Sequence, residues 1–337
     1  FAYRTFKWSN AAKGKAAVHC VIIGFGRKGA WRKQRTIFEG LSANKVSQIN
    51  QYLIDAPKVI VKSRSKPICD VPEIGIGNKP IDDGNYLFTK AEMDDFISKE
   101  PDAAQYFRPW YGAEEFINRK PRYCLYVAGV GPGELRRMPL VMQRIDRVRE
   151  YRLQSKSAGT RDIAKVPTKF HVTNIPKSHY LVIPETSSEN REYIPIGFMS
   201  PAALCSNAVR LMPDAALFHF GVLTSSAHMA WVRTVAGRLE MRYRYSKDVV
   251  YNNFPWPQPT PAQKAKIEQT AQAILDAREL YPEASLADLY DELTMPSELR
   301  KAHTTNDKAV WEAYGKAWQF DDESACVTHL MILYLQI

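Results

Sequence analysis

The residues best suited to chemistry lie together at Glu240–Tyr245, which reads Glu-Met-Arg-Tyr-Arg-Tyr. Successive side chains of a β-strand point to opposite faces, so Glu240, Arg242 and Arg244 are predicted to share an exposed face while the intervening Met and Tyr residues face the core. Arginine can donate two hydrogen bonds to guanine O6 and N7, and a carboxylate can accept from cytosine N4. The pattern therefore favours an edge that contacts DNA bases, and a solvated strand face with an ion pair across strands is the alternative.

A second group of positive side chains lies on a helix predicted over Met138–Leu153. Its inward positions at helical spacing are Leu140, Val141, Ile145, Val148 and Tyr151. The candidates for contact with DNA phosphate are Arg144, Arg147 and Arg149 on the other faces of this helix, together with Lys247. A helix that is merely solvated is the alternative.

The net charge of +10 is unevenly distributed along the 337 residues. Residues 1–38 carry nine Lys and Arg and no acid, and residues 136–169 carry ten basic against three acidic side chains. Residues 262–337 carry seven basic against thirteen acidic side chains. Basic segments of this kind are typical of nucleic-acid binding, while the acidic tail indicates a packing or partner domain.

Several other classes are disfavoured by the sequence. Its apolar runs are too short to span a membrane, and its five scattered cysteines indicate neither a zinc cage nor a disulfide framework, so a cytoplasmic protein is expected. Gly24–Gly29 fits GxGxxG, but no amphipathic helix or acidic residue follows at the spacing that a dinucleotide site requires. We find no catalytic or metal-binding constellation, and the chain alone is predicted to be inactive.

The strands and helices predicted from the rest of the sequence indicate an α+β protein. Strands are expected at Tyr3–Trp8, Val18–Phe25 (buried), His171–Ile183, Tyr193–Phe198 and Cys205–Leu211. Helices are expected at Lys90–Glu100 with Thr89 and Glu92 as a capping box, at Ser225–Arg238 with Thr224 or Ser225 as the N-cap, and after the N-cap Thr260 with Pro261 at the first position. Further short helices are expected at Leu286–Leu293, Asp307–Tyr314 and Ser324–Leu335, which makes the tail a small helical bundle.

Four long motifs carry a family resemblance. They are FAYRTFKWSNAAKGKAAVHCVIIGF, SSENREYIPIGF, FHFGVLTSSAHMAWVRTVAGRLEMRYRYS and YNNFPWP. The chain resembles the C-terminal half of the MmeI-like restriction-modification proteins of type IIL, within type IIG. These join a nuclease, an adenine-N6 DNA methyltransferase, a target recognition domain and a helical C-terminal segment in one polypeptide.

The resemblance implies a role for each part of the chain. Residues 1–41 resemble the last strands of a class I methyltransferase sheet, 42–258 a mixed α/β target recognition domain, and 259–337 the C-terminal helical domain. The S-adenosylmethionine and NPPY motifs and the nuclease of the family would lie before Phe1. This chain is thus expected to be a fragment without a cofactor of its own, with double-stranded DNA and the upstream methyltransferase domain as partners, and S-adenosylmethionine and Mg²⁺ serving the parent enzyme.

The resemblance also implies three base-reading pairs. They are Glu185 with Asn207, Ala208 with Arg244, and Glu240 with Arg242. The first and third each combine an acceptor with a donor, as a C·G pair requires, and the small Ala208 leaves Arg244 free to reach a purine. RNA binding through Tyr243 and Trp256, or binding to anionic surfaces in general, are the alternatives.

Overall fold

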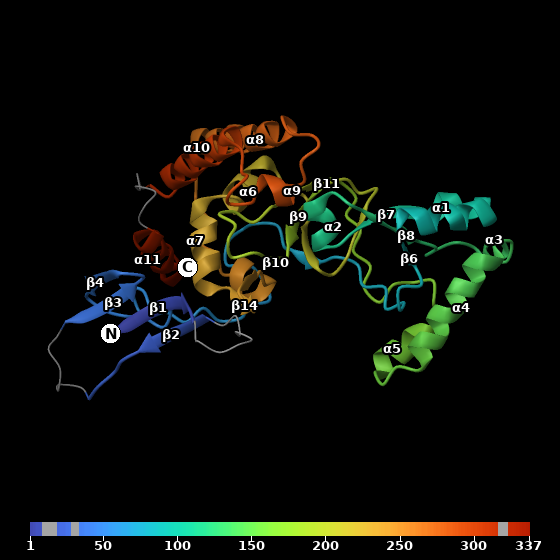
Figure 1. The fold of residues 1–337 in the computed structure, drawn as a ribbon, viewed down its shortest axis with the longest axis horizontal. Helices are drawn as coiled ribbons and strands as arrows, with labels where there is room; N and C mark the ends of the chain where they lie inside the picture. Colours follow the sequence, from blue (N-terminus) through green and yellow to red (C-terminus); the bar gives the residue numbers. More distant parts are fainter. Residues whose placement is uncertain (9–18, 28–33, 316–322) are drawn as a thin grey trace.

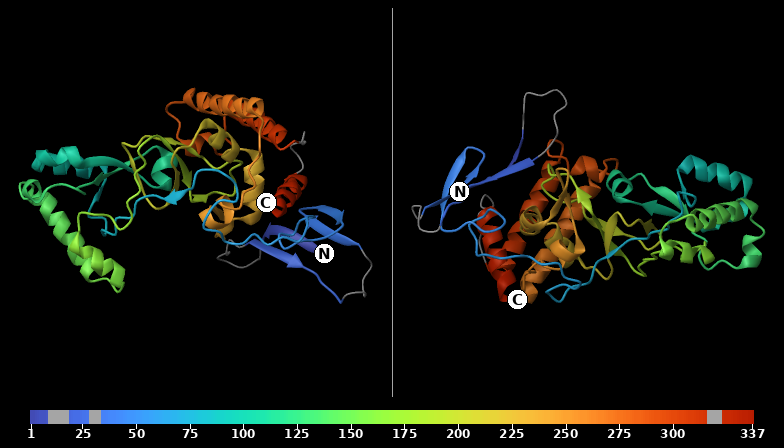
Figure 2. Two further views of the ribbon diagram at one scale, coloured as in Figure 1. Left: turned by 180° about the vertical axis from the view of Figure 1, so that it is seen from behind. Right: turned by 90° about the horizontal axis from the view of Figure 1, so that it is seen from below.

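The computed structural model describes residues 1–8, 19–27, 34–315 and 323–337, and this part of the chain contains four small sheets and eleven α-helices (Figure 1). The α+β class expected from the sequence is confirmed. In Figure 1 the first sheet and helix α4 (Pro139–Leu153) lie at opposite ends of the molecule, with strand β14 (Gly237–Leu239) between them, and Figure 2 shows the same order from two other sides.

The first sheet has the strand order β2-β1-β3-β4. Its strands are β1 (Ala2–Lys7), β2 (His19–Ile23), β3 (Arg35–Glu39) and β4 (Ser42–Val46). The prediction of a buried strand at Val18–Phe25 is wrong, because β2 is an edge strand whose residues Val21, Ile22 and Ile23 are exposed. An apolar run shows what a strand could bury, but burial also needs a covering layer, which the described residues do not supply here.

Two further sheets form the middle of the molecule, in the orders β11-β9-β13-β5 and β12-β7-β8-β6. Their strands are β5 (Gly75–Ile76), β6 (Leu87–Phe88), β7 (Phe107–Tyr111), β8 (Arg122–Leu125), β9 (Tyr180–Pro184), β11 (Gly197–Met199), β12 (Leu204–Cys205) and β13 (Val209–Met212). The single strand predicted at Cys205–Leu211 is wrong, because a turn at 206–208 carries the chain from one sheet to the other. The strand predicted from His171 begins only at Tyr180.

Helices α1 (Lys90–Lys99) and α4 (Pro139–Leu153) share a small core with the sheet that contains β7 and β8. The capping box of Thr89 and Glu92 is present as predicted. Around them lie the short helices α3 (Pro132–Leu135) and α5 (Ala158–Asp162), and the 3-10 turns η1 (Pro101–Tyr106) and η2 (Ile163–Lys165), whereas α2 (Ala113–Asn118) packs through Phe116 on the larger core described next. One inward position of α4 was predicted wrongly: Tyr151 is exposed and Arg152 is buried instead.

The larger core joins the tail to the preceding helices. Its helices are α6 (Leu217–Leu223), α7 (Ser226–Val235), α8 (Pro261–Glu279), α9 (Leu286–Leu289), α10 (Ser297–Ala313) and α11 (Glu323–Gln336). The caps predicted at Ser225 and Thr260 are present, whereas α10 begins ten residues before the predicted Asp307. At Gly221 a Cβ atom would lie 2.8 Å from Ile267, so only glycine allows α6 and α8 to approach this closely.

Candidate nucleic-acid interface

The charged stretch near position 240 forms a hairpin and not the single strand that we predicted. Helix α7 ends at Val235, three residues before the predicted end, and strands β14 (Gly237–Leu239) and β15 (Arg242–Arg244) pair antiparallel. Glu240 lies in the two-residue turn between them with φ of 57°. A strand pattern cannot reveal such a turn, because Glu and Met are not typical turn residues.

The predicted exposure of the charged side chains is nevertheless present. The side chains of Glu240, Arg242 and Arg244 are 72%, 46% and 62% exposed, and Arg242 Nη2 lies 2.9 Å from Glu240 Oε2. Tyr243 and Tyr245 are buried, as the alternation predicted. The edge therefore presents two guanidinium groups and one carboxylate to solvent.

One buried contact and one contact across the strands hold the hairpin. The Tyr245 hydroxyl lies 2.9 Å from Nε2 of the buried His228 on α7, and the guanidinium carbon of the exposed Arg238 on β14 lies 3.9 Å from the centre of the Tyr243 ring on β15. Burial lowers the pKa of His228 to about 3, so this imidazole is neutral at pH 7. A neutral ring can hydrogen-bond the Tyr245 hydroxyl without placing a charge in the core.

Glu185 connects three segments of this edge. Its N–H donates to the Ala208 carbonyl at 3.2 Å, and its own carbonyl accepts from the Tyr245 N–H at 2.7 Å. The next two residues form β10 (Thr186–Ser187), which pairs with β15 and completes the sheet β10-β15-β14. Residues far apart in the sequence, Glu185, Ala208 and Arg244, are thus brought together.

The Glu185 carboxylate lies between two arginines. Its Oε2 is 3.1 Å from Arg210 Nη2, and its Oε1 is 3.5 Å from Arg244 Nε. Glu185 and Arg210 are only 17% and 15% exposed, whereas Arg244 is largely exposed. The group is therefore an inner ion pair with an outer arginine, and its net charge is +1.

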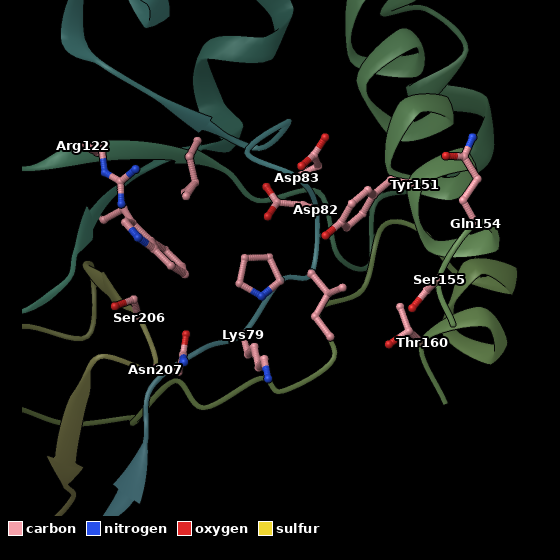
Figure 3. Close-up of a pocket in the computed structure, with 14 residues that line it drawn as sticks. Lys79, Asp82, Asp83, Arg122, Tyr151, Gln154, Ser155, Thr160, Ser206 and Asn207 are labelled. Carbon is pink, nitrogen blue, oxygen red and sulfur yellow. The ribbon is translucent and has the colours of Figure 1, made fainter. Parts of the chain in front are cut away.

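Asn207 is exposed on the turn between β12 and β13 and borders a pocket of about 780 Å³ (Figure 3). The pocket lies between this turn, the segment 79–83, and helices α4 and α5. Lys79, Arg122 and Ser206 line it together with Asp82 and Asp83, so its charge is mixed. Trp110 Nε1 is buried at its wall, and among the described residues it has no hydrogen-bond partner.

The phosphate candidates differ in how free their side chains are. Arg147 and Arg149 are exposed on α4. Arg144 is half-buried: its guanidinium carbon lies 4.7 Å from the centre of the Phe88 ring and its Nη1 donates to the Asn85 carbonyl at 3.4 Å. Lys247 lies at the start of the π-helical turn η3 (Lys247–Tyr251), and its Nζ is 3.4 Å from Glu73 Oε2.

Arg152 on α4 has a structural role that the sequence did not reveal. Its guanidinium is buried and donates to the carbonyls of Pro80, Ile81, Ile163, Val166 and Lys169 at 2.8–3.3 Å. It therefore joins α4 to two loops, one of which forms the wall of the pocket.

The tail is attached to the start of α7 by a buried carboxylate. Asp307 on α10 accepts from the Ser226 N–H at 2.6 Å and from the Tyr193 hydroxyl at 2.7 Å. Burial raises the pKa of Asp307 to about 7. Because α7 leads directly into β14, the tail supports the hairpin through this helix.

Comparisons with known proteins define the class to which this architecture belongs. Residues 55–258 match the family model "MmeI, target recognition domain", residues 259–337 match "MmeI, C-terminal domain", and residues 1–39 match "MmeI, DNA-methyltransferase domain". The chain belongs to the MmeI family, and the resemblance inferred from its motifs is confirmed. Its first strands correspond to the end of the methyltransferase domain.

Two relatives place the chain within that family. It is 49% identical to the type IIL restriction-modification enzyme MmeI, whose structure was solved in complex with DNA; the match has a TM-score of 0.91 and covers 99% of this chain and 45% of that one. It is 40% identical over 337 residues to DNA methyltransferase A of Bacillus subtilis, covering 100% of this chain and 38% of that protein. The chain thus spans less than half of either relative.

Among residues 1–8, 19–27, 34–315 and 323–337, none of the helices has the length and apolar character of a membrane span. The same residues include no cluster of three or more His, Cys, Asp or Glu side chains that could hold a metal ion. The domain boundaries, the base-reading pairs and the cofactors of the parent enzyme remain predictions.

The sequence reasoning missed Arg210, Arg238 and Arg152. Arg210 stands between the apolar residues Val209 and Leu211, which was a weak signal, but its pairing with Glu185 depends on the register of β9 and β13. Arg152 carried no signal, because its partners are backbone carbonyls of distant loops.

Proposed function

We propose that this chain is the part of an MmeI-like restriction-modification DNA methyltransferase that selects the DNA site. It binds double-stranded DNA and reads base edges with Glu185, Asn207, Ala208, Glu240, Arg242 and Arg244. The observation that carries the proposal is the convergence of three distant segments, 184–187, 206–208 and 237–244, on one exposed edge.

The chemistry of this edge suits a base-pair reader. Arg242 and Arg244 have exposed guanidinium groups: Arg242 pairs with the exposed carboxylate of Glu240, and Arg244 makes a longer contact of 3.5 Å with the mostly covered Glu185. Exposed ion pairs are worth about 0–1 kcal/mol, so exchange of a carboxylate for a guanine edge costs little. Glu240 remains beside Arg242 as an acceptor for a cytosine amine.

Duplex DNA is favoured over single-stranded RNA by the burial of the aromatic side chains. Tyr243 and Trp256 were the candidates for stacking on unpaired bases, and both are buried. Trp256 packs among Phe218, Tyr251 and Phe254. Neither ring is available as a stacking platform on the surface.

The exposed residues Val21, Ile22 and Ile23 of β2 support a second part of the proposal. We propose that this edge packs against the remainder of the methyltransferase domain, which supplies S-adenosylmethionine binding and adenine methylation in the longer enzyme, with Mg²⁺ serving its nuclease. The family match of residues 1–39 supports this placement.

A binding selection from a pool of random duplexes tests site selection. The full-length protein is expected to enrich one sequence, and the double change Glu240→Gln with Arg242→Gln is expected to relax it at one base pair by about 1–3 kcal/mol. Single-stranded RNA should compete poorly, and vesicles of anionic lipid should not compete in a sequence-dependent way. If the double variant keeps the same preference at every position while folded, the assignment of this edge is wrong.

A further inference from the structure

The ion pair between Glu185 and Arg210 is mostly covered and lies beneath the proposed edge, and the six residues assigned to base reading do not include Arg210. Arg210 lies on β13 between β9 and β5, opposite Ile183 and Ile76. Its position in a paired strand fixes its backbone, and its low exposure restricts its side chain. It is therefore a rigid cation directly behind the Glu185 carboxylate.

The contacts of Glu185 divide its two oxygens between an inner and an outer partner. Oε2 lies on the Arg210 side, and Oε1 lies near Nε of Arg244. The Nε of Arg244 is on the side of its guanidinium group, so this contact leaves the two terminal nitrogens of Arg244 available. A guanine edge is bound by two parallel N–H donors of this kind.

We propose that Arg210 is a positioning residue for base reading, which neutralises and orients Glu185 so that Glu185 can align Arg244 toward the DNA. This inference rests on the proposed function. With Arg210 in place, Glu185 is already paired and Arg244 is held only by the longer contact. Without Arg210, the half-buried carboxylate would have Arg244 as its remaining partner in this group and would draw it away from the DNA.

The role explains why the outer arginine and not the carboxylate is the exposed member of the group. Glu185 is mostly covered, whereas Arg244 is mostly exposed. Glu185 is thus placed to act on the DNA chiefly through Arg244. This prediction refines the direct base contact assigned to Glu185.

The test measures base preference at each position of the enriched site with the full-length protein and its variants. Arg244→Ala first identifies the base pair that Arg244 reads. Arg210→Met, which keeps much of the volume but removes the charge, is expected to lower the preference at that base pair about tenfold, the lower range of a bidentate contact. The base pair identified by the Glu240→Gln and Arg242→Gln changes should keep its preference.

Two further variants separate positioning from simple loss of structure. Arg210→Lys retains a positive charge, so it should restore part of the preference. The double change Arg210→Met with Glu185→Gln removes both charges, while the amide oxygen of the new side chain can still accept from Arg244 Nε, so the alignment of Arg244 and its base preference should return. Melting temperatures establish that each variant is folded, and if Arg210→Met is not folded, the lysine and double variants decide.

Arg300→Met is the control, because it removes an arginine from another Arg–Glu ion pair. Nη1 of Arg300 on α10 lies 2.9 Å from Oε2 of Glu192. It should leave every position unchanged. The inference is overturned if folded Arg210→Met keeps the full preference at the Arg244 base pair, or loses preference equally at all positions. The proposed function itself fails in a different way, if neither Arg244→Ala nor the changes at Glu240 and Arg242 alter any position.

Discussion

Helix α4 and the β14–β15 hairpin are both rich in arginine, but their arginines have different partners. On α4, Arg152 is buried and satisfied by five backbone carbonyls, and Arg144 packs on Phe88. On the hairpin, Arg242 and Arg244 are exposed and paired with carboxylates. Backbone carbonyls are fixed by the fold, whereas a surface carboxylate can be exchanged for another acceptor. The nature of the acceptor therefore distinguishes an arginine that builds structure from one that can bind a ligand.

The largest effect is expected from Arg152→Met. The change leaves five carbonyls without their donor, so α4 should lose about 3 kcal/mol or more of stability. Hydrogen exchange of the α4 amides measures this locally. Arg149→Met on the exposed face of the same helix is the control and should cost less than about 0.5 kcal/mol. Equal hydrogen-exchange protection of α4 in the two variants would show that Arg152 has no special structural role.

The support of the hairpin is expected to be sensitive to acid through His228. Its folded pKa of about 3 lies below the ordinary 6.5, so the unfolded chain binds more protons between these values and stability falls as the pH falls. By pH 4.5 this residue alone should cost on the order of 2–3 kcal/mol.

His228→Gln provides the comparison, because its amide can still hydrogen-bond the Tyr245 hydroxyl but cannot take up this proton. The stability advantage of the wild type over His228→Gln, measured by urea unfolding, should shrink steadily between pH 6.5 and pH 4.5. A constant difference would show that His228 is not buried in the neutral form. His303 is also buried with a lowered pKa, and it contributes equally in both proteins.

Arg244→Ala is expected to act on recognition and not on stability. It should lower discrimination at one base pair by about 1–3 kcal/mol, while the free energy of unfolding changes by less than about 0.5 kcal/mol. A binding selection and a urea titration give the two values. A large loss of stability would place Arg244 with Arg152 as a structural arginine.

The smallest effects are expected from Arg144, Arg147 and Arg149 of α4. Arg147→Gln and Arg149→Gln together should weaken binding to all duplexes equally and reduce the slope of log K against log salt by about 2, if each contacts one phosphate. Arg144→Gln should leave the slope unchanged, since its guanidinium is directed to Phe88 and Asn85. An altered base preference in either variant would contradict the division of roles between the two regions.

The sequence predicted local features well and long-range pairing poorly. The caps at Thr89, Ser225 and Thr260 depend on residues within one turn, and all are present. The burial of Tyr243 and Tyr245 also followed from alternation alone. The hairpin turn was missed because Glu240 adopts a conformation that its residue type does not favour.

Contacts between distant segments could not be predicted from pattern. The pairing of Glu185 with Arg210 requires the register of β9 and β13, and the exposure of β2 depends on which layer covers it. Family resemblance supplied the pairing of Ala208 with Arg244, which no periodicity contained, but it did not supply the contacts of Glu185 with these two residues. Neither periodicity nor family resemblance indicated the contacts of Arg152 with its five backbone carbonyls.

The left-handed backbone of Glu240 limits which residues can replace it in the base contact that we propose for this turn. With φ near 57°, the position favours glycine, asparagine and aspartate and disfavours branched residues such as valine or threonine. Arg242, two residues later in regular strand, is free of that restriction. Engineering of new specificities should therefore use few residue types at position 240 and many at position 242. At position 240 a replacement must first fit the left-handed backbone before its contact with a base matters.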